Sequence, residues 1–192
     1  MSDSATTDVP LEVRSALDRL ASGERDSQGD DFTQLQQLTA QPVAWADAAW
    51  QLVVPLLRHR DNRVRSIAGQ FLTRLAAAGA SRATVLSGFD ALVAVTHDER
   101  FVTARHVLTS LWQVGLVDGE VRLRLLEKLG ERCRSASEEK NAALIRYDIL
   151  CCLRHLFDET GDITVKSAAH ALIANEPEEK NTRKMQAVWR NA

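Results

Sequence analysis

Asp61-Asn-Arg-Val-Arg-Ser-Ile-Ala-Gly-Gln-Phe-Leu-Thr-Arg-Leu75 is the stretch that decides the fold. Its apolar residues recur at offsets of three and four, which places them on one face of an α-helix, because a helix turns once about every 3.6 residues. Asp61 stands where an N-cap would accept hydrogen bonds from the first backbone N–H groups of that helix. The apolar stripe consists of Val64, Ile67, Ala68, Phe71, Leu72 and Leu75.

A related pattern returns about 100 residues later, as Asp162-Ile-Thr-Val-Lys-Ser-Ala-Ala169, and continues to Ile173. Recurrence of one helical pattern is typical of a repeat array, in which each helix pair buries its apolar face against its neighbours. The sequence therefore predicts about four helix pairs in succession. Their first helices begin near Trp45, Arg82, Gly119 and Asp162.

Composition favours an all-α chain. Of 192 residues 45% are apolar, Ala and Leu dominate, and there are only nine Gly and four Pro. No window approaches the roughly 18 uninterrupted apolar residues of a membrane span, and the polar, acidic N-terminus is unlike a secretory signal. We therefore expect a cytoplasmic protein without a membrane partner. Three cysteines inside apolar helical patterns, Cys133, Cys151 and Cys152, are expected in the core.

The chain divides by charge near residue 40. Residues 1–40 carry three basic and eight acidic side chains, and we expect one or two N-terminal capping helices there. Residues 41–192 form the predicted repeat domain, whose central part, 41–155, carries 16 basic and 12 acidic side chains. Pro55 should bend the helix that precedes Asp61, and Gly79 should end the Asp61 helix in a left-handed conformation.

The series Asp61-x-x-Val64-Arg65-x-x-Ala68-x-x-x-Leu72-x-x-Leu75 resembles the second helix of a HEAT repeat. The resemblance implies a right-handed α-α superhelix, a HEAT-like solenoid of about four helix pairs plus N-terminal helices. The stretch from Asp162 to Ile173 repeats the pattern with Lys166 in place of Arg. Since the pairing makes it a first helix, the phase of the last repeats stays open.

HEAT-like proteins are mostly scaffolds that bind other macromolecules along the surface of their second helices. The resemblance thus implies a binding surface on this chain and a structural role for Asp61 and Arg65, because that Arg often joins a ladder with the Asp of the turn. Trp50 lies off the apolar stripe of its helix, so a core and an exposed position both stay open. The expected surface residues are Arg63, Ser66, Gln70, Arg74, Arg100, Thr103, His106, Ser110, Gln113 and Arg146.

The densest positive cluster is the run from Arg58 to Arg65. One interpretation is a site for an anionic partner, either acidic protein or nucleic-acid phosphate, since Arg offers bidentate geometry to both. The other is a solvated helix end running into a capped turn, where cations favour the helix dipole.

Motifs of catalysis or cofactor binding are absent from the sequence: it contains no phosphate-binding Gly-rich loop, no Cys-x-x-Cys and no nucleophile elbow. Cys151 and His155, four apart on one helix, could reach one metal ion, but nothing clearly supplies further ligands. Asp148 beside Trp112 and Arg105 would be similar to the site of HEAT-like alkylpurine DNA glycosylases.

We therefore expect a non-enzymatic protein-interaction or scaffold module with no cofactor and no metal. The alternatives are a nucleic-acid-binding or DNA-repair protein of the glycosylase kind, and a lyase- or chaperone-type HEAT protein. The sequence leaves the oligomeric state open.

Overall fold

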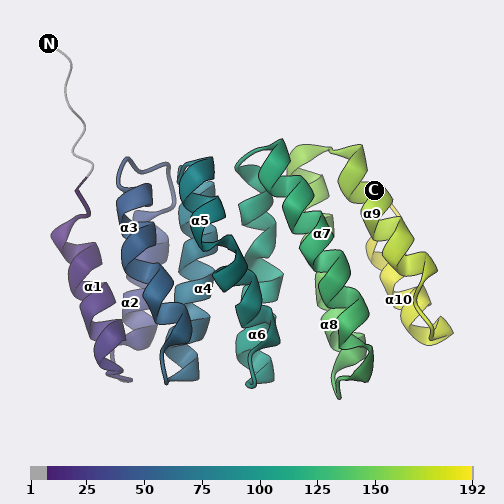
Figure 1. The fold of residues 1–192 in the computed structure, drawn as a ribbon, viewed down its shortest axis with the longest axis horizontal. Coiled ribbons are helices and arrows are strands. Elements are labelled where there is room, and N and C mark those ends of the chain that lie inside the picture. Colours follow the sequence, from purple (N-terminus) through teal and green to yellow (C-terminus); the bar gives the residue numbers. More distant parts are fainter. Residues whose placement is uncertain (1–7, 192) are drawn as a thin grey trace, which may run out of the picture. The chain divides into compact units, whose positions relative to one another are not determined.

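The computed structural model describes residues 8–191, and within them every regular element is helical (Figure 1). The prediction of an all-α chain is confirmed. The ten α-helices of this range match the expected two N-terminal helices and four pairs. Among these helices, none is both long and apolar enough to cross a membrane.

Two compact units divide the chain, Met1–Val107 and Leu108–Ala192. The boundary near residue 40 stays a prediction; α1 and α2 lie in the first unit, where α1 packs on α2 and α2 on α4. The helices of the first unit are α1 (Leu11–Ser22), α2 (Gln28–Leu38), α3 (Ala46–Val53), α4 (Asn62–Ala77), α5 (Arg82–Ala94) and the start of α6 (Phe101–Ser110).

The core of the first unit is built on α4, as its apolar spacing predicts. Val64, Phe71, Leu72 and Leu75 are completely buried, in contact with helices on more than one side, including α2 and α3. Burying a side chain of this size stabilises the fold by about 1.5–3 kcal/mol relative to leaving it exposed. The stripe that defines α4 in the sequence is therefore the centre of this unit.

Both ends of α4 follow the expected chemistry. The Asp61 carboxylate accepts a hydrogen bond from the Arg63 N–H at 2.8 Å, which caps the first turn. At the other end Gly79 has φ of +115°, and the Ala80 N–H reaches back to the Leu75 carbonyl at 3.0 Å. These are the positive φ and the backbone bond of a Schellman cap.

The helix before α4 changes type at Pro55. It leaves the α-helical form at Val53 and continues as a 3₁₀ segment, Val54–Arg58. Proline cannot donate the backbone hydrogen bond that an α-helix interior needs, which explains the change. The predicted bend at Pro55 stays a prediction, but the helix does change type there.

Trp50 belongs to the core, which decides between the two positions left open by the sequence. It is completely buried, because α5 covers the side of α3 that α4 does not. Gly88 of α5 makes room for the indole: a Cβ at this position would lie 2.7 Å from Trp50 Nε1. Helix packing this close requires glycine at the point of contact.

Arg65 joins two helix starts in the first unit. Its guanidinium makes two hydrogen bonds to the Asp98 carboxylate, at 2.5 and 2.9 Å, and a third to the His59 carbonyl. The expected partner was Asp61, but that carboxylate instead accepts from Arg25 at 3.3 Å. Asp98 also accepts from the backbone N–H of Arg100, just before α6.

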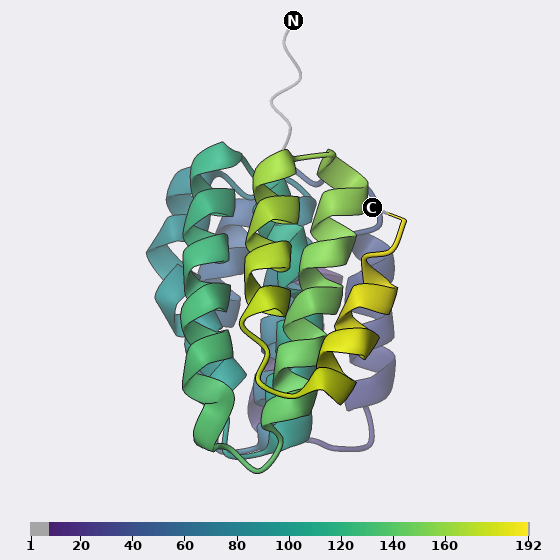
Figure 2. The ribbon, with the colours of Figure 1, turned by 90° about the vertical axis from the view of Figure 1, so that its right-hand side faces the viewer.

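The second unit contains the end of α6 and a 3₁₀ segment, Leu111–Leu116, followed by four helices. Figure 2 shows α9 lying over the seam between α7 and α8, with α10 against the other side of α8. The apolar residues of α8 extend round much of its circumference, and this arrangement covers the helix on two sides. The four helices are α7 (Gly119–Ser135), α8 (Ala142–Thr160), α9 (Ile163–Ala174) and α10 (Glu179–Val188).

The second unit repeats the arrangement of Arg65 and Asp98. Asp118 caps α7 and Asp162 caps α9, and Arg122, four residues after the first cap, binds the second at 2.9 Å. The Asp-and-cation pattern thus marks α4 in the first unit but α7 and α9 in the second.

Candidate binding groove

The expected surface residues of the first unit lie along α4 and α6, but two of them are buried. Thr103 is 1% exposed and its hydroxyl donates to the Asn62 carbonyl at 3.1 Å. Ser66 is 5% exposed, with its Oγ 3.0 Å from Nδ1 of the exposed His106. Their exposure was wrongly predicted, because these side chains join α4 to α6.

Arg74 and Gln70 are only half-exposed. Arg74 donates to the carbonyl oxygens of Gln36 and Thr39 at 3.3 and 3.1 Å, at the C-terminal end of α2. A cation there satisfies carbonyl groups that have no partner within the helix. Gln70 donates to the Ser66 carbonyl at 3.2 Å. The Arg74 contact ties α2 to α4.

The basic run is embedded in mixed charge. Arg58, Arg60 and Arg63 are exposed, as is Arg100 further on. The loop before α2 and the start of α2, which approach this run at Gly23 beside His59 and at Gly29 beside Arg63, expose acidic side chains. These are Glu24, Asp26 and Asp30. The alternation favours a solvated surface over a contiguous anion-binding face.

In the second unit the expected surface residues are mostly withdrawn from solvent. Gln113 is 8% exposed and Ser110 is half-buried. Arg146 makes two hydrogen bonds to Glu176, at 2.6 and 3.1 Å, and both side chains are almost completely covered. The prediction of Arg146 as a surface residue is therefore wrong, because its charge is neutralised inside the protein.

Four of the residues considered for chemistry, Asp148, Trp112, Cys151 and His155, lie in the second unit. Asp148 is 3% exposed, and the Trp112 ring packs on His155 with centroids 5.8 Å apart. No group of three or more His, Cys, Asp or Glu in this range is placed to hold a metal ion. Burial raises the pKa of the Cys133 and Cys152 thiols, which keeps both protonated at neutral pH.

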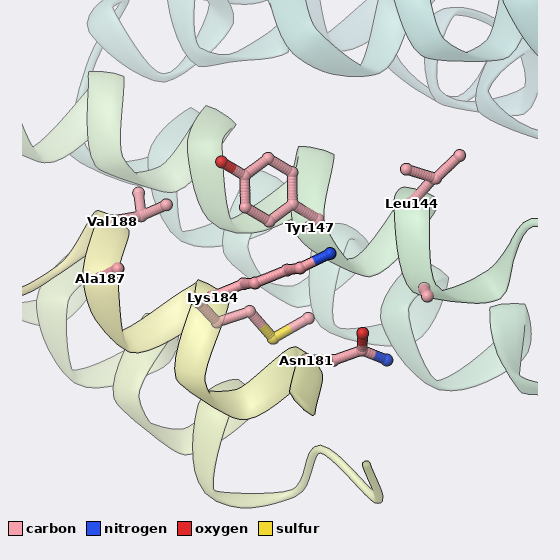
Figure 3. A pocket seen from close by; sticks show the side chains of 8 residues that line it. Leu144, Tyr147, Asn181, Lys184, Ala187 and Val188 are labelled. Atoms are coloured by element: carbon pink, nitrogen blue, oxygen red, sulfur yellow. The ribbon is translucent and has the colours of Figure 1, made fainter. Parts of the chain in front are cut away.

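A groove of about 620 Å³ runs between α8 and α10 (Figure 3). This volume falls in the range of pockets that bind ligands, roughly 300–1,000 Å³. Tyr147 and Lys184 project into the space from opposite helices, and Leu144 and Val188 stand at its two ends. Among the described residues, the lining consists of Ala143, Leu144, Tyr147, Asn181, Lys184, Met185, Ala187 and Val188.

The groove is fixed at both ends of α10. Before α10 begins, Glu176 pairs with Arg146 of α8, and the Asn181 amide donates to Glu176 at 3.1 Å. Burial of Glu176 opposes its ionisation, but the hydrogen bonds from Arg146 and Asn181 outweigh it and lower its pKa. The carboxylate is therefore charged at neutral pH and holds the start of α10.

Two further hydrogen bonds hold the end of α10. The Trp189 indole N–H donates to the Leu150 carbonyl at 3.2 Å, and Arg154 donates to the Val188 carbonyl at 2.9 Å. Trp189 is 4% exposed, so this anchor lies in the core. With both ends attached to α8, the groove between them is preformed, which lowers the conformational cost of binding.

The lining combines apolar contact with a single charge. Leu144 is 44% exposed although it is a large aliphatic residue, and Met185 forms a buried floor at 1% exposure. Methionine adapts its shape readily to different occupants. Lys184 is exposed and, among the lining residues that the structure describes, is the only one with a charged side chain. Such a surface suits recognition of a largely apolar segment.

None of the lining residues was predicted as a site. The available signal was the breadth of the α8 apolar face, which is more than one neighbouring helix can cover. On α10 the lining residues Asn181, Lys184, Met185 and Val188 follow helical spacing, yet nothing in the sequence says that this face meets α8.

Comparison of the sequence with protein-family models finds no match, and comparison with curated proteins finds no significant match either.

Proposed function

We propose that the protein is a non-enzymatic protein-interaction or scaffold module, and that the groove between α8 and α10 binds a segment of its partner. The observation that carries this proposal is the exposed apolar lining around Leu144, held open between two anchored ends of α10. Exposed apolar surface of this kind commonly marks an interaction site. The polar faces of α4 and α6 are less suited to binding a partner, since their side chains largely bind one another.

The proposal includes a HEAT-like solenoid architecture. Support comes from the succession of helices joined by short connections and from the capping carboxylate that recurs in each unit with an arginine from an earlier helix. In this interpretation α8 and α10 are the second helices of their pairs. The groove then lies on the kind of surface that HEAT-like proteins use for binding.

Site-specific photo-crosslinking tests the function. A photoreactive phenylalanine analogue replaces Leu144 in the groove or Leu123, a 60% exposed leucine of α7, as the matched control. After irradiation in extract of the native cells, Leu144 substitution should give a discrete protein adduct that excess unlabelled wild-type protein suppresses. The same adduct yield at both positions, or none at Leu144, would contradict the assignment of the groove.

A further inference from the structure

We propose that the occupant of the groove is an amphipathic α-helix of a partner protein, with an acidic residue next to its apolar stripe that meets Lys184. This inference rests on the proposed function and names the class of partner segment. It follows from the backbone of the walls, the length of the lining and the sign of its one charge.

The walls of the groove favour a helix over an extended segment. Both walls are helices, whose interior N–H and C=O groups are already bonded within α8 and α10. They offer no edge to which an extended chain could add its own hydrogen bonds. An extended segment would leave its polar backbone unpaired against Leu144 and Met185, whereas a helix satisfies its backbone internally.

The length of the lining fits about two helical turns. On α10 it runs from Asn181 to Val188, which spans roughly 10 Å at about 1.5 Å per residue. On α8 it runs from Ala143 to Tyr147, one turn. A bound helix of this length would present apolar side chains at positions i, i+3 or i+4, and i+7.

The charge of the lining selects an acidic residue. Lys184 lines the groove, and Lys180, one turn earlier on the same face of α10, is also exposed. The other nearby polar groups are engaged: Asn181 donates to Glu176 and Glu178, and Arg183 pairs with Glu179. A carboxylate on the occupant would gain an ion pair with Lys184, whereas a lysine there would be repelled.

The test uses a display library of 16-residue peptides in a helix-forming frame, with apolar and flanking positions randomised, selected on the wild-type protein. Enriched peptides are then labelled with fluorescein and titrated by fluorescence anisotropy. We expect them to share apolar residues at i, i+3 or i+4, and i+7 beside an Asp or Glu, and to gain helical circular dichroism on binding.

Single variants measure separately how the apolar lining and the Lys184 charge contribute to binding. Leu144→Asp should weaken binding at least about tenfold, because it removes an exposed apolar contact and places a carboxylate where the acidic helix is proposed to bind. Lys184→Glu should weaken it about two- to fivefold, the range of an exposed ion pair, and changing the peptide acid to Lys should restore it. Arg183→Glu, also on α10 but outside the lining, should bind as wild type does.

The outcomes distinguish this inference from the function on which it rests. Enriched peptides that lack the helical spacing, or that ignore Lys184→Glu, would overturn the acidic helix while leaving a peptide-binding groove. A selection without enrichment would overturn it as well, and photo-crosslinking at Leu144 would then decide separately whether the groove binds protein. Circular dichroism of each variant verifies that it is folded.

Discussion

At the scale of single residues, buried apolar side chains and pairs of polar groups hold this fold together. The apolar stripe of α4 is buried, and the Arg65 guanidinium binds the Asp98 carboxylate, which connects the start of α4 to the start of α6. The two largest errors of sequence interpretation, Arg146 and Thr103, concern polar residues that find partners far along the chain.

The first prediction concerns Leu72, which is completely buried at the centre of α4. Leu72→Ala should reduce the free energy of unfolding by about 2–5 kcal/mol, because it removes apolar contacts and leaves a cavity. Urea denaturation followed by circular dichroism measures the change. Leu123→Ala, at a 60% exposed position, is the control and should stay within about 0.5 kcal/mol of wild type. Equal losses in the two variants would mean that the stripe is not the core.

At the scale of elements, α10 depends on a buried ion pair more than on its own sequence. It is a ten-residue helix, and helices shorter than about 12–15 residues are marginal by themselves in water. Its attachment to α8 through Glu176 and Arg146 therefore sets its stability and the shape of the groove.

The second prediction follows from this attachment. Glu176→Gln should destabilise the fold by about 3–5 kcal/mol, since it leaves the Arg146 charge buried without a carboxylate. Hydrogen exchange of the α10 amides should accelerate. In the control Glu179→Gln, which removes a fully solvated partner of Arg183, exchange should stay unchanged. Unchanged α10 protection in Glu176→Gln would show that the pair does not hold this helix.

Helix positions were predictable from the sequence because they depend on local spacing and on caps such as Asp61 and Gly79. The contacts between helices were not predictable from the sequence. Periodicity distinguishes an apolar from a polar face, but Trp50 is buried because Gly88 of another helix receives it. Arg146 is neutralised by a residue 30 positions away, and the groove arises between α8 and α10, which are not consecutive. Those contacts exist only once the helices are packed against one another.

At the scale of the whole molecule, stability should depend on ionised carboxylates in both units. The pKa is lowered in Asp61, Asp98, Asp162 and Glu176. In Asp162 hydrogen bonds from Thr164 are the main cause, whereas in the other three burial opposes ionisation and hydrogen bonds outweigh it. Each folded pKa lies below its unfolded value, so folding favours the charged form.

The third prediction is therefore a loss of stability in acid. The contribution of these carboxylates is complete above the unfolded values, about pH 4–5, and disappears as the pH falls through the lowered folded values. Urea denaturation between pH 7 and pH 3 should show it. Asp98→Asn should flatten the dependence, because that side chain no longer titrates, and the exposed Glu127→Gln should not. A wild-type stability that is independent of pH in this interval would rule out the mechanism.

The Arg65–Asp98 and Arg122–Asp162 pairs also bear on how the length of the chain between two helix starts can change. Arg65 and Asp98 are 33 residues apart, whereas Arg122 and Asp162 are 40 apart, a difference of about two helical turns. Each ion pair connects the starts of two helices and can form whatever the length of the chain between them. The helix between the partners is longer in the second unit, where α8 has 19 residues against 13 in α5. Insertions of whole turns can thus lengthen the intervening helix, and with it the surface that this helix exposes, while the following helix still begins at the same carboxylate.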